Sequence, residues 1–174
     1  MSTGPTPKFL PRWELDGVTG AVVAIDVLRA FTSAAFALGA GAKAIYLVST
    51  IEEALTFVRS HPDALSMGED HGRRIPGFTF SNSPAEVSRA DIAGRILVQR
   101  TSAGTQGVSS ATHATRLWCA SLVCAGATAD AVNRAALGAP TYVITGRVQD
   151  GRDSGEDDLA CAEYIEGSAH RQTC

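Results

Sequence analysis

The most constraining feature of this sequence is a regular alternation of short apolar runs with helix-forming segments. Residues 21–25 form a continuous apolar run (AVVAI), which is typical of a strand buried on both faces of a sheet. Further strands are predicted at residues 44–48, 64–67, 95–99, 117–123 and 141–145. Because connecting helices bring successive strands into parallel order, the alternation predicts a three-layer α/β/α fold with a mostly parallel or mixed sheet.

Helix signals fill the intervals between these runs. An alanine-rich segment over residues 28–38 ends at two nearby glycines, as helices commonly do. Thr50 followed by Glu53 predicts a capping box that opens a helix extending to about Ser60. The remaining predicted helices start at residues 83–86, follow the turn at residues 101–107, or cover residues 128–137 and 157–166.

Composition limits the class of protein. Of the 174 residues, 45% are hydrophobic and 19% are charged, and the formal net charge is −3 without a basic stretch. These values exclude a disordered chain and argue against a nucleic-acid-binding protein. No signal peptide and no apolar stretch long enough to cross a bilayer is recognisable. The four cysteines form no Cys-x-x-Cys pair and are interpreted as incidental thiols, so we expect a single cytoplasmic domain without a membrane partner.

Polar residues that suit catalysis follow the predicted strands, where ligands bind in open α/β sheets. They are Asp26, Arg29, Glu69, Asp70, Arg100, Thr101, Ser102 and Arg147, with Asp157 and Asp158 at the start of the final helix. Carboxylates without nearby histidine or cysteine favour magnesium or manganese over zinc, and arginines bind phosphate oxygens. A metal ion with arginines is what phosphoryl transfer requires, although many α/β proteins with strand-end carboxylates bind no phosphate.

The turn that follows the strand at residues 95–99 has hydroxyl groups and a glycine. Its sequence, Arg100–Thr105, is neither a Walker motif nor a dinucleotide-binding fingerprint, because the required lysine and glycine spacing is absent. On its own it favours an ordinary strand-to-helix turn over a phosphate-binding loop.

At these same places the sequence resembles the 2-phosphosulfolactate phosphatase family. The matching segments, in family order, are Ile25–Ala30 (IDVLRA), Glu52–Ala54, Gly68–Glu69 with Gly72, Gly77–Phe78 followed by Ser81–Pro84 (SNSP), Arg100–Thr105, and Glu156–Asp158 with Cys161. The resemblance covers residues 20–166, almost the whole chain. It implies a three-layer α/β fold and magnesium-dependent hydrolysis of 2-phospho-3-sulfolactate to sulfolactate and phosphate, a step of coenzyme M synthesis.

The resemblance also implies roles for particular residues. The candidate Mg²⁺ ligands are Asp26, Glu69, Asp157 and Asp158, of which only one of the last two is expected to bind. The candidate catalytic residues are Asp26, Arg29 and Arg100, and the candidate substrate-binding residues are Asn82, Ser83, Thr101 and Ser102. Most have a structural alternative: a helix cap for Asp26 and Ser83, a salt bridge for Arg29 and Arg100, helix-dipole stabilisation for the paired aspartates, a solvated loop position for Glu69 and a turn-fixing role for Asn82.

Two departures from the family pattern leave alternatives open. The threonine-rich turn of the family, Thr-Thr-Asn-Gly-Thr, is replaced by Thr101–Thr105 (TSAGT) after an arginine, and the chain ends sooner than expected, as if the C-terminal part of the family domain were absent. The alternatives are a phosphatase for a different phosphorylated acid, a non-catalytic anion- or metabolite-binding protein, and a structural oligomer module. Homo-oligomerisation is compatible with all of them.

Overall fold

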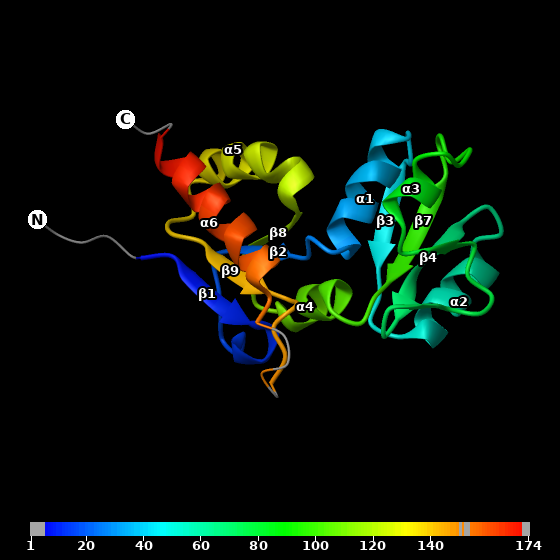
Figure 1. Cartoon of the computed structure of the whole chain (residues 1–174), viewed down its shortest axis with the longest axis horizontal. Coiled ribbons are helices and arrows are strands. Elements are labelled where there is room, and N and C mark those ends of the chain that lie inside the picture. Colours follow the sequence, from blue (N-terminus) through cyan, green and yellow to red (C-terminus); the bar gives the residue numbers. More distant parts are fainter. Residues whose placement is uncertain (1–5, 150, 152–153, 172–174) are drawn as a thin grey trace, which may run out of the picture.

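The chain forms an α/β fold whose strands divide between two sheets (Figure 1). The computed structural model describes residues 6–149, 151 and 154–171. The first sheet has the order β1-β9-β2-β8 and is parallel throughout; its strands are β1 (Lys8–Pro11), β9 (Thr141–Ile144), β2 (Ala21–Ile25) and β8 (Arg116–Ala120). The predicted fold class is therefore confirmed, with two sheets in place of one.

The second sheet lies at the other end of the long axis in Figure 1. Its order is β3-β7-β4-β5, with β6 pairing β4 off this path; the strands are β3 (Ala44–Leu47), β7 (Ile96–Arg100), β4 (Leu65–Asp70), β5 (Arg73–Arg74) and β6 (Phe80–Ser81). Only the β4–β5 pair is antiparallel among the described pairings. Parallel order follows from the helical connections between strands.

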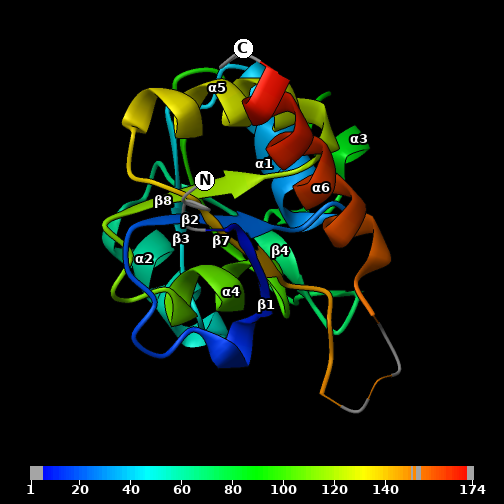
Figure 2. The ribbon, with the colours of Figure 1, turned by 90° about the vertical axis from the view of Figure 1, so that its left-hand side faces the viewer.

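Helices cover both faces of each sheet. They are α1 (Ala30–Gly39), α2 (Ile51–Ser60), α3 (Pro84–Val87), α4 (Gly104–Ser110), α5 (Ala125–Ala135) and α6 (Glu156–Arg171), with short 3₁₀ turns η1 (Arg12–Glu14) and η2 (Leu122–Cys124). Figure 2 shows α5 and α6 on one side of the first sheet and α4 on the other. None of the helices in the described part of the chain is long and apolar enough to cross a membrane.

The alternation of side chains along each buried strand divides the core between these layers. In β2, Val23 and Ile25 pack in the cluster that contains α5 and α6 residues, whereas Val22 and Ala24 pack on the opposite face with Phe31 of α1. These four side chains are fully buried, and Ala21, the first residue of β2, is 2% exposed. Successive side chains of a strand point to opposite faces, so an uninterrupted apolar run is what a strand covered on both faces requires.

The chain passes twice between the two sheets. Helix α1 connects β2 of the first sheet to β3 of the second, and α4 returns the chain from β7 to β8. The N-termini of both helices therefore follow carboxyl ends of strands at the junction of the sheets. Contact between α1 and α4 brings these two crossings together.

Most predicted elements are confirmed, and the differences occur where local signals are weak. The strand at residues 21–25 and the Thr50–Glu53 capping box are as predicted, with Thr50 Oγ1 accepting from Glu53 N at 3.1 Å. The predicted strand at residues 117–123 ends at Ala120, and Leu122 and Val123 form the exposed turn η2. Strand β1 was not predicted, because four residues beside prolines carry little periodic signal.

Candidate active site

A cleft opens at the junction of the sheets, beyond the carboxyl ends of the strands. Its larger part, about 440 Å³, is lined by Arg12, Asp26, Leu28, His71, Ser102, Ala103, Thr145, Gly146, Val148, Asp157 and Asp158. A smaller hollow, about 220 Å³, is lined by Asp26, Leu28, Arg29, Glu69, His71, Gly72, Asn82, Ser102 and Ala103. The two parts share five lining residues and form one continuous cleft, at the place where ligands bind in open α/β sheets.

Asp26 directly follows β2 and lies at the centre of the cleft. Its side chain is 6% exposed, and Oδ1 accepts a hydrogen bond from Ala30 N at 2.8 Å, which holds the first turn of α1. Burial raises the pKa of Asp26 to about 6, against the lowering effect of the Ala30 and Gly104 backbone N–H groups. The neighbouring charges of Glu69 and Asp157 raise this pKa further.

Asp158 and Asp157, at the start of α6, have different surroundings. Asp158 is 2% exposed, and its carboxylate accepts from Val27 N and Gly146 N, both at 2.8 Å. Burial raises the pKa of Asp158 to about 7, and the charges of Asp26 and Asp157 add to the effect. Asp157 lines the cleft and is partly exposed, and its carboxylate has no hydrogen bond or ion pair within the described residues. Asp157 is therefore the acid of the pair with lone pairs free for a ligand.

Glu69 connects the β4–β5 hairpin to the turn before α4. Its Oε1 accepts from Ser102 N at 2.6 Å and its Oε2 from Gly72 N at 2.5 Å. The two-residue hairpin loop, His71 and Gly72, has φ values of 48° and 77°, as tight hairpin turns require. His71 N also donates to Ser102 Oγ at 2.8 Å, so the hairpin tip is fixed against the wall of the cleft.

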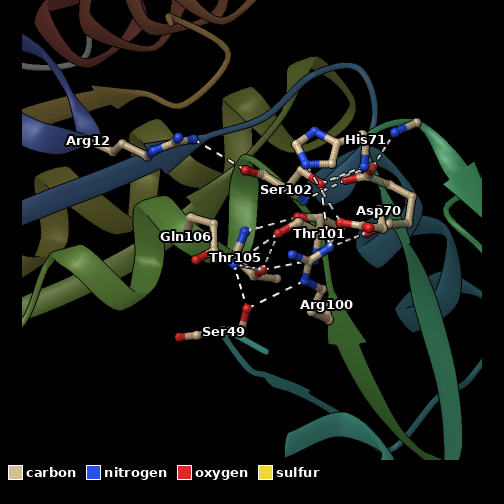
Figure 3. Close-up of polar contacts among 11 residues, drawn as sticks. Arg12, Ser49, Asp70, His71, Arg100, Thr101, Ser102, Thr105 and Gln106 are labelled. Carbon is tan, nitrogen blue, oxygen red and sulfur yellow. Dashed lines mark hydrogen bonds and ion pairs between the residues drawn. The ribbon is translucent and has the colours of Figure 1, made fainter. Parts of the chain in front are cut away.

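Arg100 joins three elements and does not line the cleft. Figure 3 shows its guanidinium directed toward Asp70 and Ser49. Arg100 Nη1 donates to Asp70 Oδ1 at 2.7 Å and to Glu69 O at 2.9 Å, and Nε donates to Ser49 O at 3.4 Å. Its side chain is 15% exposed. These contacts match the salt-bridge alternative for this residue.

Thr101 and Ser83 also make local structural contacts. Thr101 is 1% exposed and exchanges two hydrogen bonds with Thr105: Thr101 N donates to Thr105 Oγ1 at 2.9 Å, and Thr105 N donates to Thr101 Oγ1 at 3.1 Å. Ser83 caps α3, with its Oγ accepting from Glu86 N at 3.4 Å. Neither residue lines the cleft.

Arg29 and Asn82 line the smaller hollow together with Ser102. Arg29 is exposed, and its side chain makes no hydrogen bond or ion pair within the part of the chain that the structure describes. Asn82 is 4% exposed, and its Oδ1 accepts from Gln99 Nε2 at 3.4 Å. With the oxygen turned toward Gln99, the amide nitrogen of Asn82 is left as a donor.

The cleft thus brings together most of the predicted site residues. It includes Asp26, Arg29, Glu69, Asn82, Ser102, Asp157 and Asp158, and it leaves Ser83, Arg100 and Thr101 outside its lining. All three are near cleft-lining residues in the sequence, since Ser83 follows Asn82 and Arg100 and Thr101 precede Ser102. Their contacts support the walls of the cleft. Arg147, another strand-end residue, donates from Nε to Ser154 O at 3.3 Å.

Among the residues that the sequence did not indicate are Arg12, which lines the cleft, and Gln99, which contacts the cleft residue Asn82. Arg12 lines the larger part of the cleft because it follows β1, and recognising that strand would have placed it at the carboxyl edge. Gln99 is fully buried within β7, and its Nε2 donates to Ala30 O at 2.9 Å as well as to Asn82. The available signal was a glutamine directly after the apolar run Ile96–Val98 of a predicted strand. Its Oε1 has no partner among the described residues.

The donor chemistry of the cleft fits a hard cation, because the carboxylates supply only oxygen. Three carboxylates line its larger part: Asp26, Asp157 and Asp158. Within the described residues, however, no group of three or more histidine, cysteine or acidic side chains is arranged closely enough to hold a metal ion. The magnesium site therefore stays a prediction.

The fold and the cleft define an open-sheet α/β protein with an acidic cleft at the carboxyl ends of its strands. The chain belongs to the 2-phosphosulfolactate phosphatase family: the family model described as 2-phosphosulpholactate phosphatase matches residues 7–173. The resemblance inferred from the motifs is thereby confirmed.

Curated relatives carry the corresponding name, "Probable 2-phosphosulfolactate phosphatase". The chain is 38% identical over 145 residues to the protein of Bacillus subtilis, covering 83% of this chain and 62% of that protein. It is 42% identical over 122 residues to the protein of Carboxydothermus hydrogenoformans, covering 70% of this chain and 50% of that protein. It is 37% identical over 149 residues to the protein of Thermus thermophilus, covering 83% of this chain and 61% of that protein. The chain thus spans less than two thirds of the length of these relatives.

Proposed function

We propose that this chain hydrolyses the phosphate ester of a small organic acid in a magnesium-dependent reaction, with 2-phospho-3-sulfolactate as its substrate. One observation carries the proposal: in a member of this family, the buried carboxylates of Asp26, directly after β2, and Asp158, in α6, share a cleft with Arg29, which has no ion pair among the described residues. The names of the relatives support the substrate.

The smaller hollow supplies the groups for the phosphate. Arg29 presents a guanidinium without a partner among the described residues, and a guanidinium matches phosphate oxygens bidentately. Asn82 adds an amide donor whose orientation Gln99 fixes, and Ser102 adds a hydroxyl. These three residues would bind and orient the phosphoryl group.

The larger part of the cleft supplies the groups for the cation. Asp26 and Asp157 would hold Mg²⁺, because both are oxygen donors that line the larger part of the cleft. Glu69 lines only the adjoining hollow, and each of its two oxygens accepts a backbone N–H bond, so it would act as a ligand only by giving up one of these bonds. When bound, the ion would neutralise phosphoryl charge and orient the group for displacement. Asp158, whose carboxylate already accepts two backbone N–H bonds, would keep the start of α6 and hence Asp157 in position.

The decisive experiment is a phosphate-release assay with 2-phospho-3-sulfolactate and related phosphorylated acids, with Mg²⁺ or with a chelator. We expect release from 2-phospho-3-sulfolactate that depends on Mg²⁺. The variant Asp26→Asn should lose about 100-fold or more of this activity, since losing a ligand costs at least as much as losing its supporting contacts. Asparagine can still accept the hydrogen bond from Ala30 N, so circular dichroism should show an intact fold.

The matched control is Asp91→Asn, which changes an exposed aspartate in the loop before β7. This variant should turn over like the unmodified protein. Full activity of Asp26→Asn would show that the cation and the reaction lie elsewhere. Substrate-induced stabilisation without phosphate release would instead identify the binding-protein alternative.

A further inference from the structure

Arg12 brings a second cationic group into the cleft from a distant part of the chain. Strand β1 pairs in parallel with β9, and Pro11 lies opposite Ile144, so the next residue emerges at the carboxyl edge of the first sheet. Arg12 is partly buried, and its Nη1 donates to Ser102 O at 3.3 Å. Figure 3 shows the guanidinium reaching from η1 toward Ser102.

Within the residues that the structure describes, the charge of Arg12 is not compensated by an ion pair. The larger part of the cleft also contains Asp26, Asp157 and Asp158, yet within the described residues none of them lies within 4.0 Å of a guanidinium nitrogen of Arg12. The single hydrogen bond to Ser102 occupies one of five guanidinium N–H groups. Arg12 therefore has donors left for a ligand in the cleft.

The two arginines of the site lie at different ends of the cleft. Arg29 lines only the smaller hollow and Arg12 only the larger part, with Asp26, Leu28, His71, Ser102 and Ala103 common to both. A phosphate bound beside Arg29 would leave Arg12 facing the remainder of the substrate. Two separated guanidinium groups match a ligand with two separate anionic groups, and the carboxylates between them match a metal cation that bridges to this ligand.

We propose that Arg12 binds the acid group of the substrate, a carboxylate or sulfonate, and thereby selects phosphate esters that carry a second anion. This inference rests on the proposed phosphatase function. The alternative is that Arg12 only anchors the turn before α4 through Ser102 O. The two readings differ in their consequences, since loss of an anchor affects every substrate and loss of a ligand contact affects only substrates that possess the acid group.

The test compares Arg12→Gln with the unmodified protein on two substrates. For 2-phospho-3-sulfolactate, kcat/KM should fall about 10- to 100-fold, the range for losing a hydrogen bond to a charged group. For p-nitrophenyl phosphate, which has no carboxylate or sulfonate, kcat/KM should stay within about 3-fold. Arg89→Gln, which alters an exposed arginine away from the cleft, should change neither value. Equal losses on both substrates, or none on either, would overturn the proposal.

A binding measurement separates this inference from the proposed reaction. Isothermal titration with sulfolactate and with inorganic phosphate, in the presence of Mg²⁺, requires no turnover. Arg12→Gln should weaken sulfolactate binding about 10-fold or more and leave phosphate binding unchanged, whereas Arg29→Gln should weaken phosphate binding. If sulfolactate binds Arg12→Gln as tightly as the unmodified protein, or binds neither, Arg12 does not recognise the acid group. Absence of hydrolysis by the unmodified protein would overturn only the proposed function.

Discussion

Three carboxylates at the cleft, two buried and one partly buried, are fixed by backbone N–H groups of neighbouring segments. Asp26 holds the first turn of α1, and Asp158 holds the ends of β2 and β9. Glu69 holds the hairpin tip and the turn before α4. Backbone donors that fix a carboxylate leave its other lone pairs in defined directions, so the same residues support the fold and shape the ligand site.

The adjacent aspartates of α6 allow these two contributions to be separated. Asp158→Ala leaves the N–H groups of Val27 and Gly146 without their acceptor, so we expect the free energy of unfolding to fall by about 2–4 kcal/mol. Asp157→Ala removes no hydrogen bond to any described residue and should change the free energy of unfolding by less than about 0.5 kcal/mol. Urea unfolding in chelator measures both values, and a larger loss for Asp157→Ala would reverse the assignment of their roles.

At the scale of elements, the site depends on the close approach of α4 to the β2–α1 connection. A Cβ atom at Gly104, the first residue of α4, would lie 2.7 Å from both Asp26 Oδ2 and Ala30 Cβ. Any larger residue would push α4 away from Asp26. The glycine of the family-like turn therefore has a packing reason, independent of phosphate binding.

This contact predicts the effect of Gly104→Ala. Overpacking of this kind costs about 1–3 kcal/mol, and the displaced α4 should also lower activity through Asp26. The matched control is Gly126→Ala in α5, where an added Cβ meets nothing within 4 Å and alanine favours the helix by up to about 1 kcal/mol. Thermal unfolding of both variants tests the prediction, which fails if the two substitutions have the same sign.

At the scale of the whole molecule, the cleft concentrates negative charge where the two sheets meet. Burial and mutual repulsion raise the pKa of Asp26 to about 6 and that of Asp158 to about 7, from 3.8 in both cases. Between pH 4 and 7 the folded chain therefore binds more protons at these groups than the unfolded chain. Their contribution to stability is fully present below the unfolded pKa and is lost as pH rises through the folded values.

The cation-free protein should accordingly lose stability as pH rises. In chelator, we expect the free energy of unfolding to fall by on the order of 2–4 kcal/mol between about pH 5 and pH 8, as proton linkage requires. Mg²⁺ should restore part of this loss at about pH 8 by binding the ionised carboxylates. Urea unfolding across this range checks the slope, with Asp16→Asn, at an exposed site, as a control. Stability that rises with pH would contradict the burial argument.

Elements with local causes can be predicted from the sequence alone. The apolar run of β2 specifies a strand covered on both faces, and the Thr50–Glu53 capping box specifies the start of α2. The sequence also identified the family and placed Asp26 and Arg29 after β2, because neighbouring residues must emerge at the same strand end. These inferences need only the hydrophobic pattern, the chemistry of helix caps and the order of residues along the chain.

Tertiary structure decided everything that depends on pairing between distant segments. The division into two sheets and the pairing of β1 with β9 bring Arg12 to the cleft. There it contacts Ser102, which lies 90 residues away along the chain. Packing also turned Arg100 toward Asp70, outside the cleft. A local pattern states that a side chain follows a strand, whereas its direction and neighbours follow from strand order and packing between elements, which no window of sequence contains.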